Sequence, residues 1–179
     1  TKFDNMCVLK YKPYIFIYMF GGDIMDYFIT QETLLIMPIT KTQTKILEND
    51  NVMFVDSKTF KIVNDNCKLY GSTYLNRVEF SKTILKCRCK MPIILDNDGN
   101  IILFPTTSKR QEHCAWLNYN NIKSYKEQGS KNVVVTFLNG IKIVINMSYY
   151  TFEHQINKCH RLKLDYLEKK VSIVHKNAR

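Results

Sequence analysis

Residues 67–77 of this chain place a glycine, two hydroxyl side chains and an arginine in a pattern that suits phosphate binding. Gly71 is followed by Ser72 and Thr73, and Arg77 comes about one helical turn later. Gly71 favours the end of one helix, and Ser72 or Thr73 favours the start of another. The first turn of that second helix would present free backbone N–H groups, which bind phosphate. Arg77 could then bridge phosphates or enter a narrow minor groove of A·T-rich DNA.

Positive charge is concentrated around this segment. Residues 58–90 contain eight basic residues against two acidic ones, a net charge of +6. Residues 156–179 contain seven basic residues against two acidic ones, a net charge of +5. A lysine that contacts a phosphate releases condensed counterions from nucleic acid. We therefore expect three lysines near the glycine to bind the DNA backbone: Lys68, Lys82 and Lys86.

The same residues also fit an ordinary helix surface. In this alternative, Ser72 does no more than cap the second helix, and Arg77 does no more than pair with Glu79 or Asp65. Lysines on the outer side of a helix often do no more than face water. A formal net charge of +10 suggests an anionic partner, but it does not distinguish nucleic acid from another acidic surface.

A second candidate for DNA contact is the polar turn at residues 106–110, which reads TTSKR. It offers three hydroxyl groups and the cations of Lys109 and Arg110, which are the donors that position a protein on the DNA backbone. Lys123 and the asparagines before it would extend the same surface. An ordinary polar loop is the alternative interpretation.

The motifs favour a binding protein over an enzyme or a metalloprotein. The sequence lacks a phosphate-binding loop, a dinucleotide fingerprint and the GxSxG and HExxH motifs. Zinc ligands could come from Cys87 and Cys89 together with either His113 and Cys114 or Cys159 and His160. Adjacent ligands seldom face one ion, and no CxxC pair is present. We expect no enzymatic activity, no cofactor and no bound metal.

Hydrophobic periodicity predicts a mixture of strands and helices. We expect strands at residues 14–20, 27–30, 34–39, 40–47 and 52–55. A helix capped by Ser57 and a second helix capped by Ser72 or Thr73 should follow. We also expect hairpins centred on residues 96–100 and on Asn139-Gly140, with a long bent strand at residues 114–126 between them. The last helix begins near Ser148, and its apolar stripe consists of Phe152, Ile156, Cys159, Leu162 and Tyr166.

Four sequence blocks together resemble the competence transcription factor (ComK) family. They are residues 67–77, 101–107 (IILFPTT), 114–116 (CAW) and 148–152 (SYYTF), in the family's order and at about its spacing. The resemblance covers residues 27–164, and Cys67 and Cys114 fall at its recurring positions, whereas Cys87 and Cys89 depart from it. It implies an oligomeric activator of competence genes that recognises A·T-rich promoter boxes through the minor groove and the phosphate backbone. It also implies contacts with RNA polymerase and with a protease adaptor.

The predicted architecture is an α+β fold with a mostly antiparallel sheet, central helices and a C-terminal amphipathic helix. We expect residues 1–25 to form a variable arm or an extra strand, residues 26–170 to form one ComK-like DNA-binding domain, and residues 171–179 to form a basic tail. The C-terminal helix or an edge strand would mediate self-association.

The longest apolar run falls short of the ~20 residues that cross a bilayer. We therefore expect a cytoplasmic, nucleoid-associated protein that makes no membrane contact and keeps its thiols reduced. Two alternatives stay open, an RNA- or other anionic-partner-binding module and a protein-interaction domain without nucleic-acid activity.

Overall fold

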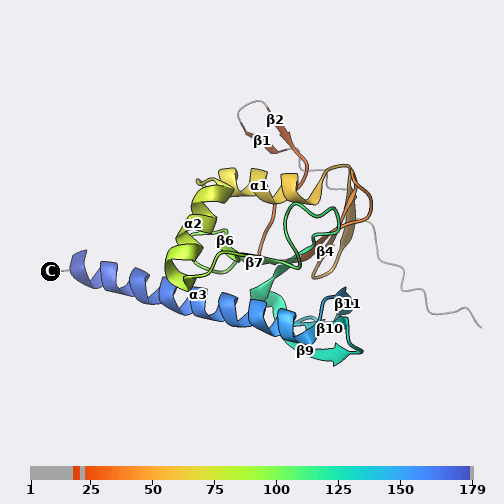
Figure 1. Ribbon diagram of the computed structural model, residues 1–179. Coiled ribbons are helices and arrows are strands. Elements are labelled where there is room, and N and C mark those ends of the chain that lie inside the picture. The colour runs from red at the N-terminus through yellow and green to blue at the C-terminus, as the bar shows by residue number, and fades with distance from the viewer. Residues whose placement is uncertain (1–17, 21–22, 178–179) are drawn as a thin grey trace, which may run out of the picture.

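A computed structural model describes the backbone of residues 18–20 and 23–177 and the side chains of residues 26–172. It confirms the α+β fold, and every strand pair among the described residues is antiparallel (Figure 1). The helices are α1 (Thr59–Leu69), α2 (Tyr74–Leu85), the short 3-10 helix η1 (Tyr119–Asn121) and α3 (Tyr149–Asn177). The strands are β1 (Tyr18–Phe20), β2 (Asp23–Met25), β3 (Thr33–Pro38), β4 (Thr44–Glu48), β5 (Val52–Val55), β6 (Ile93–Ile94), β7 (Ile102–Pro105), β8 (Trp116–Asn118), β9 (Ile122–Gln128), β10 (Asn132–Phe137) and β11 (Lys142–Asn146).

The strands form a six-stranded sheet, a three-stranded sheet and a small two-stranded one. The six-stranded sheet has the order β5-β4-β3-β8-β7-β6, and the three-stranded sheet has the order β11-β10-β9. β1 and β2 pair with each other. In Figure 1, α1 lies over one side of the six-stranded sheet, and α3 lies on the other side with the three-stranded sheet beneath its first half.

The six-stranded sheet separates two hydrophobic cores, because successive side chains of a strand point to opposite faces. Trp116 packs with Val63 of α1 in one core. Phe104 packs with Phe152 of α3 in the other, where the two ring centroids are 5.7 Å apart. All four side chains are fully buried. The two cores fix α1 and α3 on opposite faces of one framework.

Both predicted hairpins are confirmed, and each has a local cause. The Asp96 carboxylate accepts hydrogen bonds from the N–H groups of Asn100 and Ile101, which closes the β6–β7 turn. Gly140 has a φ of 87° in the β10–β11 turn, a conformation that glycine adopts without a steric cost. The strand registers on either side follow from these turns.

The predicted strand at residues 27–30 is wrong, because this segment pairs with a side chain instead of a strand. The Asn66 side chain of α1 accepts from the Ile29 N–H at 2.8 Å and donates to the Tyr27 carbonyl at 2.8 Å. One buried amide thus satisfies the polar groups that a neighbouring strand would otherwise satisfy. The predicted strand at residues 14–20 lies outside the described residues except for its last three, which form β1.

The predicted bent strand at residues 114–126 is also wrong, because η1 divides it into β8 and β9. β8 belongs to the six-stranded sheet, and β9 belongs to the three-stranded one. The Asn118 and Asn121 side chains donate to the Thr33 carbonyl at 3.1 and 3.0 Å. These asparagines hold the chain in the turn at which it leaves one sheet for the other.

The helix junction at Gly71 follows the sequence prediction. Gly71 has a φ of 79°, and the Ser72 N–H donates to the Cys67 carbonyl at 3.0 Å, which is the usual ending of a helix at a glycine. Thr73 then caps α2. The predicted Ser57 cap of α1 is wrong by one residue, since Lys58 occupies the N-cap position and makes no side-chain capping bond.

The C-terminal helix starts at Tyr149, as its periodicity predicts. The predicted stripe faces the core, with Phe152, Cys159 and Leu162 fully buried. The helix continues to Asn177, so residues 171–177 of the expected basic tail are helical. Among the described residues, no helix is long and apolar enough to span a membrane.

Candidate nucleic-acid interface

The Arg77 guanidinium lies inside the junction of α1 and α2. Its Nη1 donates to the Ile94 carbonyl at 2.6 Å, and its Nη2 donates to the carbonyls of Tyr70 at 2.8 Å and Cys67 at 3.4 Å. Burial lowers the pKa of Arg77, but arginine remains charged in proteins. Because these carbonyls accept from both Nη atoms, Arg77 joins the end of α1 to β6. This geometry argues against the expected role of Arg77 in DNA contact.

The two hydroxyl residues of the junction have different environments. Thr73 Oγ1 accepts a hydrogen bond from the Asn76 N–H at 3.1 Å, so the Thr73 side chain is engaged in capping. Ser72 lies partly exposed in the turn between the helices. Capping of α2 therefore accounts for Thr73, whereas the side chain of Ser72 is still partly accessible.

Two of the lysines expected at the DNA are paired with carboxylates of their own helices. Lys68 Nζ lies 3.3 Å from Asp65 of α1, and Lys82 Nζ lies 2.7 Å from Glu79 of α2. Both pairs have the i,i+3 spacing at which helix side chains meet. The charges of Lys68 and Lys82 are therefore compensated locally on the outer sides of α1 and α2, and the net charge of +6 in residues 58–90 comes from the other six basic residues.

Lys86 lies in a more basic environment at the end of α2. It is exposed and adopts a φ of 51°, which turns the chain into the loop before β6. Arg88 and Lys90 belong to the same loop, and Lys158 of α3 donates to the Cys89 carbonyl at 2.9 Å. Four cations from two elements therefore meet around this loop.

A second group of cations lines a groove at the start of α1. The groove has a volume of about 240 Å³ and is formed by segments around residues 38–41, 58–60 and 109–114. Its charged lining residues are Lys41, Lys58, Lys109, Arg110 and Glu112. Lys41 and Glu112 form an exposed ion pair at 3.0 Å. Lys58 and Arg110 are exposed and make no ion pair within residues 26–172, so the groove carries a net positive charge.

Lys109 is held over two aromatic rings at the wall of the groove. Its Nζ lies 4.5 Å from the ring centroid of Phe60 and 4.2 Å from that of Tyr74, distances typical of cation–π contacts. Burial lowers the pKa of Lys109, and the neighbouring charge of Arg110 lowers it further. The rings therefore fix the position of the ammonium group, which reduces the entropy that it would lose on binding a phosphate.

The start of α1 adds to the positive potential of the groove. Lys58 is extended at the N-cap position, and Thr59 and Phe60 of the first turn line the groove. The helix macrodipole places a partial positive charge at this end. Neither Lys58 nor Lys41 is among the predicted contact residues, because their neighbours in the sequence form no recognisable binding pattern. Only the folded chain brings these lysines to the loop of Lys109 and Arg110.

Lys123 lies on another part of the molecule. It is exposed at the start of β9, where the pairing with β10 is irregular. The predicted continuous surface from residues 106–110 to Lys123 is divided, because η1 carries the chain into the three-stranded sheet. Lys109 and Arg110 belong to the groove, whereas Lys123 belongs to the sheet.

Most of the described cysteines are small buried side chains and do not form a set of metal ligands. Cys67, Cys114 and Cys159 are buried, and burial raises the pKa of the Cys67 thiol to about 11. Cys87 is partly exposed and Cys89 is exposed. Among the described residues, no three histidine, cysteine or acidic side chains lie where they could hold a metal ion.

The second half of α3 carries an exposed apolar stripe. Leu164 is 48% exposed, Leu167 is 37% exposed and Val171 is 55% exposed, although each is a large hydrophobic residue. They recur at intervals of three and four, the spacing of residues on one side of a helix. In Figure 1 this part of α3 extends beyond the sheets. The stripe is therefore available to another helix.

Comparison with known proteins gives a consistent result. The model of the family described as "ComK protein" matches residues 24–171. The competence transcription factor of Bacillus subtilis (strain 168) is 30% identical over 147 residues, which cover 80% of this chain and 77% of that protein. No solved structure matches.

Proposed function

The chain belongs to the ComK family, and from this premise we propose that it activates transcription of competence genes by binding A·T-rich promoter DNA. The observation that assigns DNA contact to particular residues is the basic groove at the start of α1. There Lys58, Lys109 and Arg110 come together from two distant segments, with Glu112 as the charged lining residue of opposite sign. Such a local excess of positive charge attracts the phosphate backbone.

The side chains of the groove suit different parts of the duplex. Lys58 and Lys109 present ammonium groups, which act as point charges for phosphates. Arg110 presents an exposed guanidinium, and A·T runs narrow the minor groove and concentrate negative potential there. The preference for A·T-rich boxes would then come from the insertion of Arg110 into the minor groove between flanking phosphate contacts.

The other predicted contact residues are ranked by how free their charges are. Lys86 is next, because it lies in the basic loop before β6 without a carboxylate partner within residues 26–172. Lys68 and Lys82 must give up an ion pair to bind phosphate, although exposed pairs contribute only about 0–1 kcal/mol. Ser72 offers a hydroxyl for a backbone contact near Lys68. An activator bound at promoters would also contact RNA polymerase, reside on the nucleoid and be open to a protease adaptor.

The test of this function is competition binding at one fixed salt concentration. Labelled A·T-rich duplex is displaced by unlabelled A·T-rich duplex, G·C-rich duplex or single-stranded RNA. We expect the A·T-rich competitor to be effective at concentrations at least tenfold below the other two, because the minor groove separates A·T from G·C pairs. Equal competition by RNA would favour the RNA- or anion-binding alternative. Binding to none of them would favour a protein-interaction domain.

Self-association through α3 is the second part of the proposal. A second copy of α3 offers the same stripe of Leu164, Leu167 and Val171, so that two chains can bury it against each other about a two-fold axis. A two-fold assembly suits paired half-sites on DNA.

We expect Leu164→Glu together with Val171→Glu to convert the oligomer into monomers in sedimentation equilibrium. Association through the stripe would bury the introduced glutamate carboxylates without a partner, which costs free energy and opposes the contact. Leu75→Glu is the matched control, because Leu75 is 65% exposed on α2 and lies away from the stripe. An unchanged molecular mass for the α3 variant would exclude this interface.

A further inference from the structure

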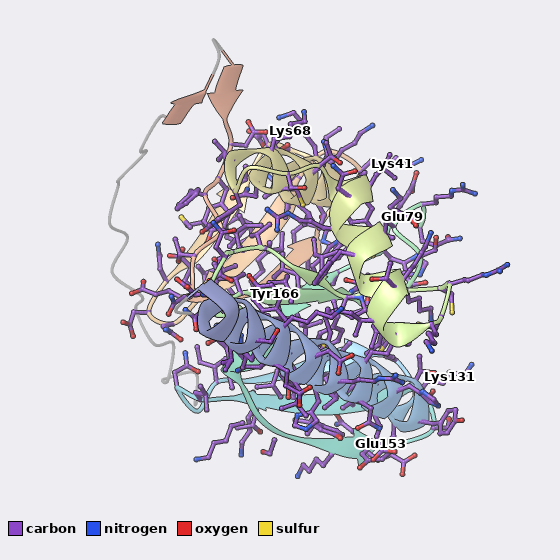
Figure 2. The ribbon with its side chains drawn as sticks, turned by 90° about the vertical axis from the view of Figure 1, so that its left-hand side faces the viewer. Lys41, Lys68, Glu79, Lys131, Glu153 and Tyr166 are labelled. Carbon is purple, nitrogen blue, oxygen red and sulfur yellow. The ribbon has the colours of Figure 1, made fainter. Side chains whose placement is uncertain are left out.

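β11 forms one edge of the three-stranded sheet. It pairs with β10 on one side, and no strand among the described residues pairs with its other side. Figure 2 shows this sheet below α3, at the end of the molecule opposite to α1. An unpaired strand edge presents a row of backbone N–H and C=O groups to any other strand that approaches it. The outer edge of β11 can therefore accept a further strand.

The turn before β11 determines which of its backbone groups face outwards. The Phe137 N–H donates to the Ile141 carbonyl at 2.9 Å, so these residues form a hydrogen-bonded pair. Hydrogen-bonded and non-hydrogen-bonded pairs alternate along an antiparallel ladder. Every second residue of β11 therefore directs its N–H and C=O groups away from β10. These residues are Lys142, Val144 and Asn146. Within the part of the chain that the structure describes, their outward groups make no backbone hydrogen bond.

The outward groups of β11 are complementary to those of a second copy of the strand. When two β11 strands run antiparallel about Val144, each Val144 lies opposite the other, and Lys142 of each copy lies opposite Asn146 of the other. All of these pairs join outward-facing residues, so each pair can exchange two hydrogen bonds. Like charges do not meet, because Lys142 is the charged residue of the strand and lies opposite an amide.

Three exposed apolar side chains lie along the same edge. Leu138 in the preceding turn is 61% exposed, Val144 is 54% exposed, and Tyr150 at the start of α3 is 70% exposed. Leu138 and Tyr150 are equally far from Val144 in the sequence, one before it and one after it. In the antiparallel arrangement the start of one strand meets the end of the other, which brings Leu138 of each copy towards Tyr150 of the other. Apolar residues grouped around an unpaired edge are typical of a protein interface.

The other edges of the two larger sheets are less suited to self-pairing. β9 carries three charged side chains and has an irregular register beside η1. β5 lies between Asp50 and Asp56, whose carboxylates would meet those of a second copy. β6 is only two residues long. Charges, irregularities and short strands are the usual means of preventing edge pairing. β11 pairs with β10 in an unbroken register and has a single charge.

We propose that β11 pairs antiparallel with β11 of a second copy, about a two-fold axis at Val144, so that their three-stranded sheets form one continuous sheet. This contact depends neither on DNA binding nor on the α3 contact, whose exposed stripe lies in the second half of that helix (Figure 1). Two different two-fold contacts on one chain link more than two copies. α1 and its basic groove lie at the opposite end of the molecule (Figure 2), so pairing of β11 leaves them open to DNA.

Val144→Pro tests the contact through the backbone. Proline lacks the outward N–H and its ring obstructs an approaching strand, whereas an edge strand tolerates proline where the N–H faces away from the sheet. Because a short strand offers a small contact area, we expect the association at higher protein concentration than the pairing of α3. In sedimentation equilibrium at high concentration, Val144→Pro should weaken it at least tenfold. Val144→Thr is the matched control, since it keeps the N–H and a β-branched side chain, and should associate like the unsubstituted chain.

Val144→Cys measures the register directly. Two residues of a hydrogen-bonded antiparallel pair have Cα atoms about 5.5 Å apart, which is within the range that a disulfide spans. We expect oxidised glutathione to link two copies through this position. Lys142→Cys should give at least fivefold less linked dimer, because two copies of residue 142 would lie roughly 13 Å apart along the strands. The unsubstituted chain, with six cysteines of its own, gives the background, and mass spectrometry of peptides identifies the linked residues.

A folded Val144→Pro chain that associates as strongly as Val144→Thr would overturn the inference, and thermal melting establishes that each variant is folded. If the proline variant does not fold, the cysteine variants decide. Equal yields from Val144→Cys and Lys142→Cys, or no linked dimer above the background, would also overturn it. None of these results changes the outcome of the duplex competition or of the α3 variant, so failure of this inference is distinguishable from failure of the proposed function.

Discussion

Replacing Arg77 with alanine is expected to lower the free energy of unfolding by about 3 kcal/mol and to leave the DNA affinity of the folded protein nearly unchanged. The guanidinium donates to the carbonyls of Ile94, Tyr70 and Cys67, and truncation removes a charged donor from each of them inside the α1–α2 junction, where the Cys67 carbonyl keeps the Ser72 N–H. Hydrogen bonds to charged groups contribute about 1.5–3 kcal/mol each, and losses within one network do not add. For a chain of this size, the melting temperature should fall by roughly 6–12 °C.

The Arg77 experiment needs a control for arginine and a separate DNA measurement. Arg88→Ala removes an exposed arginine from the loop before β6 and should change stability by no more than about 0.5 kcal/mol. DNA affinity is measured well below the melting temperature, so that both variants are folded. If Arg77→Ala kept full stability and lost DNA binding, Arg77 would be a DNA contact after all, as its place in the sequence suggests.

Removing three charges from the α1 groove is expected to weaken DNA binding about a hundredfold at 0.15 M salt. The variant combines Lys58→Gln, Lys109→Gln and Arg110→Gln, which keep polar side chains of moderate length. Each lost phosphate contact reduces the slope of log affinity against log salt by about 0.9, so the slope should fall by nearly three units. Titration of an A·T-rich duplex at four or five salt concentrations measures both quantities.

A matched variant distinguishes the effect of the groove on DNA affinity from the effect of total positive charge. Lys61→Gln, Lys68→Gln and Lys82→Gln also remove three positive charges, but these lysines are paired with acidic side chains on α1 and α2. We expect this variant to reduce the salt slope by less than one unit. Equal losses from the two variants would mean that total charge, and no particular surface, determines the affinity.

Local sequence signals predict much of the fold. Asn139-Gly140 predicts its hairpin because glycine adopts a positive φ there, and Gly71 predicts the end of α1 for the same reason. The stripe from Phe152 to Tyr166 predicts both α3 and its buried side, since helical spacing alone decides which residues share a face. The i,i+3 spacing of Asp65 to Lys68 and of Glu79 to Lys82 is also that of helix ion pairs, a signal that was not used when Lys68 and Lys82 were predicted to bind DNA.

The candidate site depends on contacts between distant residues. Lys58 and Lys109 are 51 positions apart in the numbering of the chain, and they meet because the six-stranded sheet brings the end of β7 beside the start of α1. The three-stranded sheet is separate from the six-stranded one because η1 turns the chain out of the larger sheet, held by asparagine bonds to Thr33.

Arg77 shows most directly what only the tertiary structure decides. Nothing in residues 67–77 indicates that the Ile94 carbonyl will lie 2.6 Å from its guanidinium. By itself, the sequence determined the periodicities, the turns and an excess of positive charge, because these depend on residues close together in the chain. The tertiary structure decided which cations face water and which are used inside, because a charge is free or satisfied according to groups that folding brings to it from elsewhere.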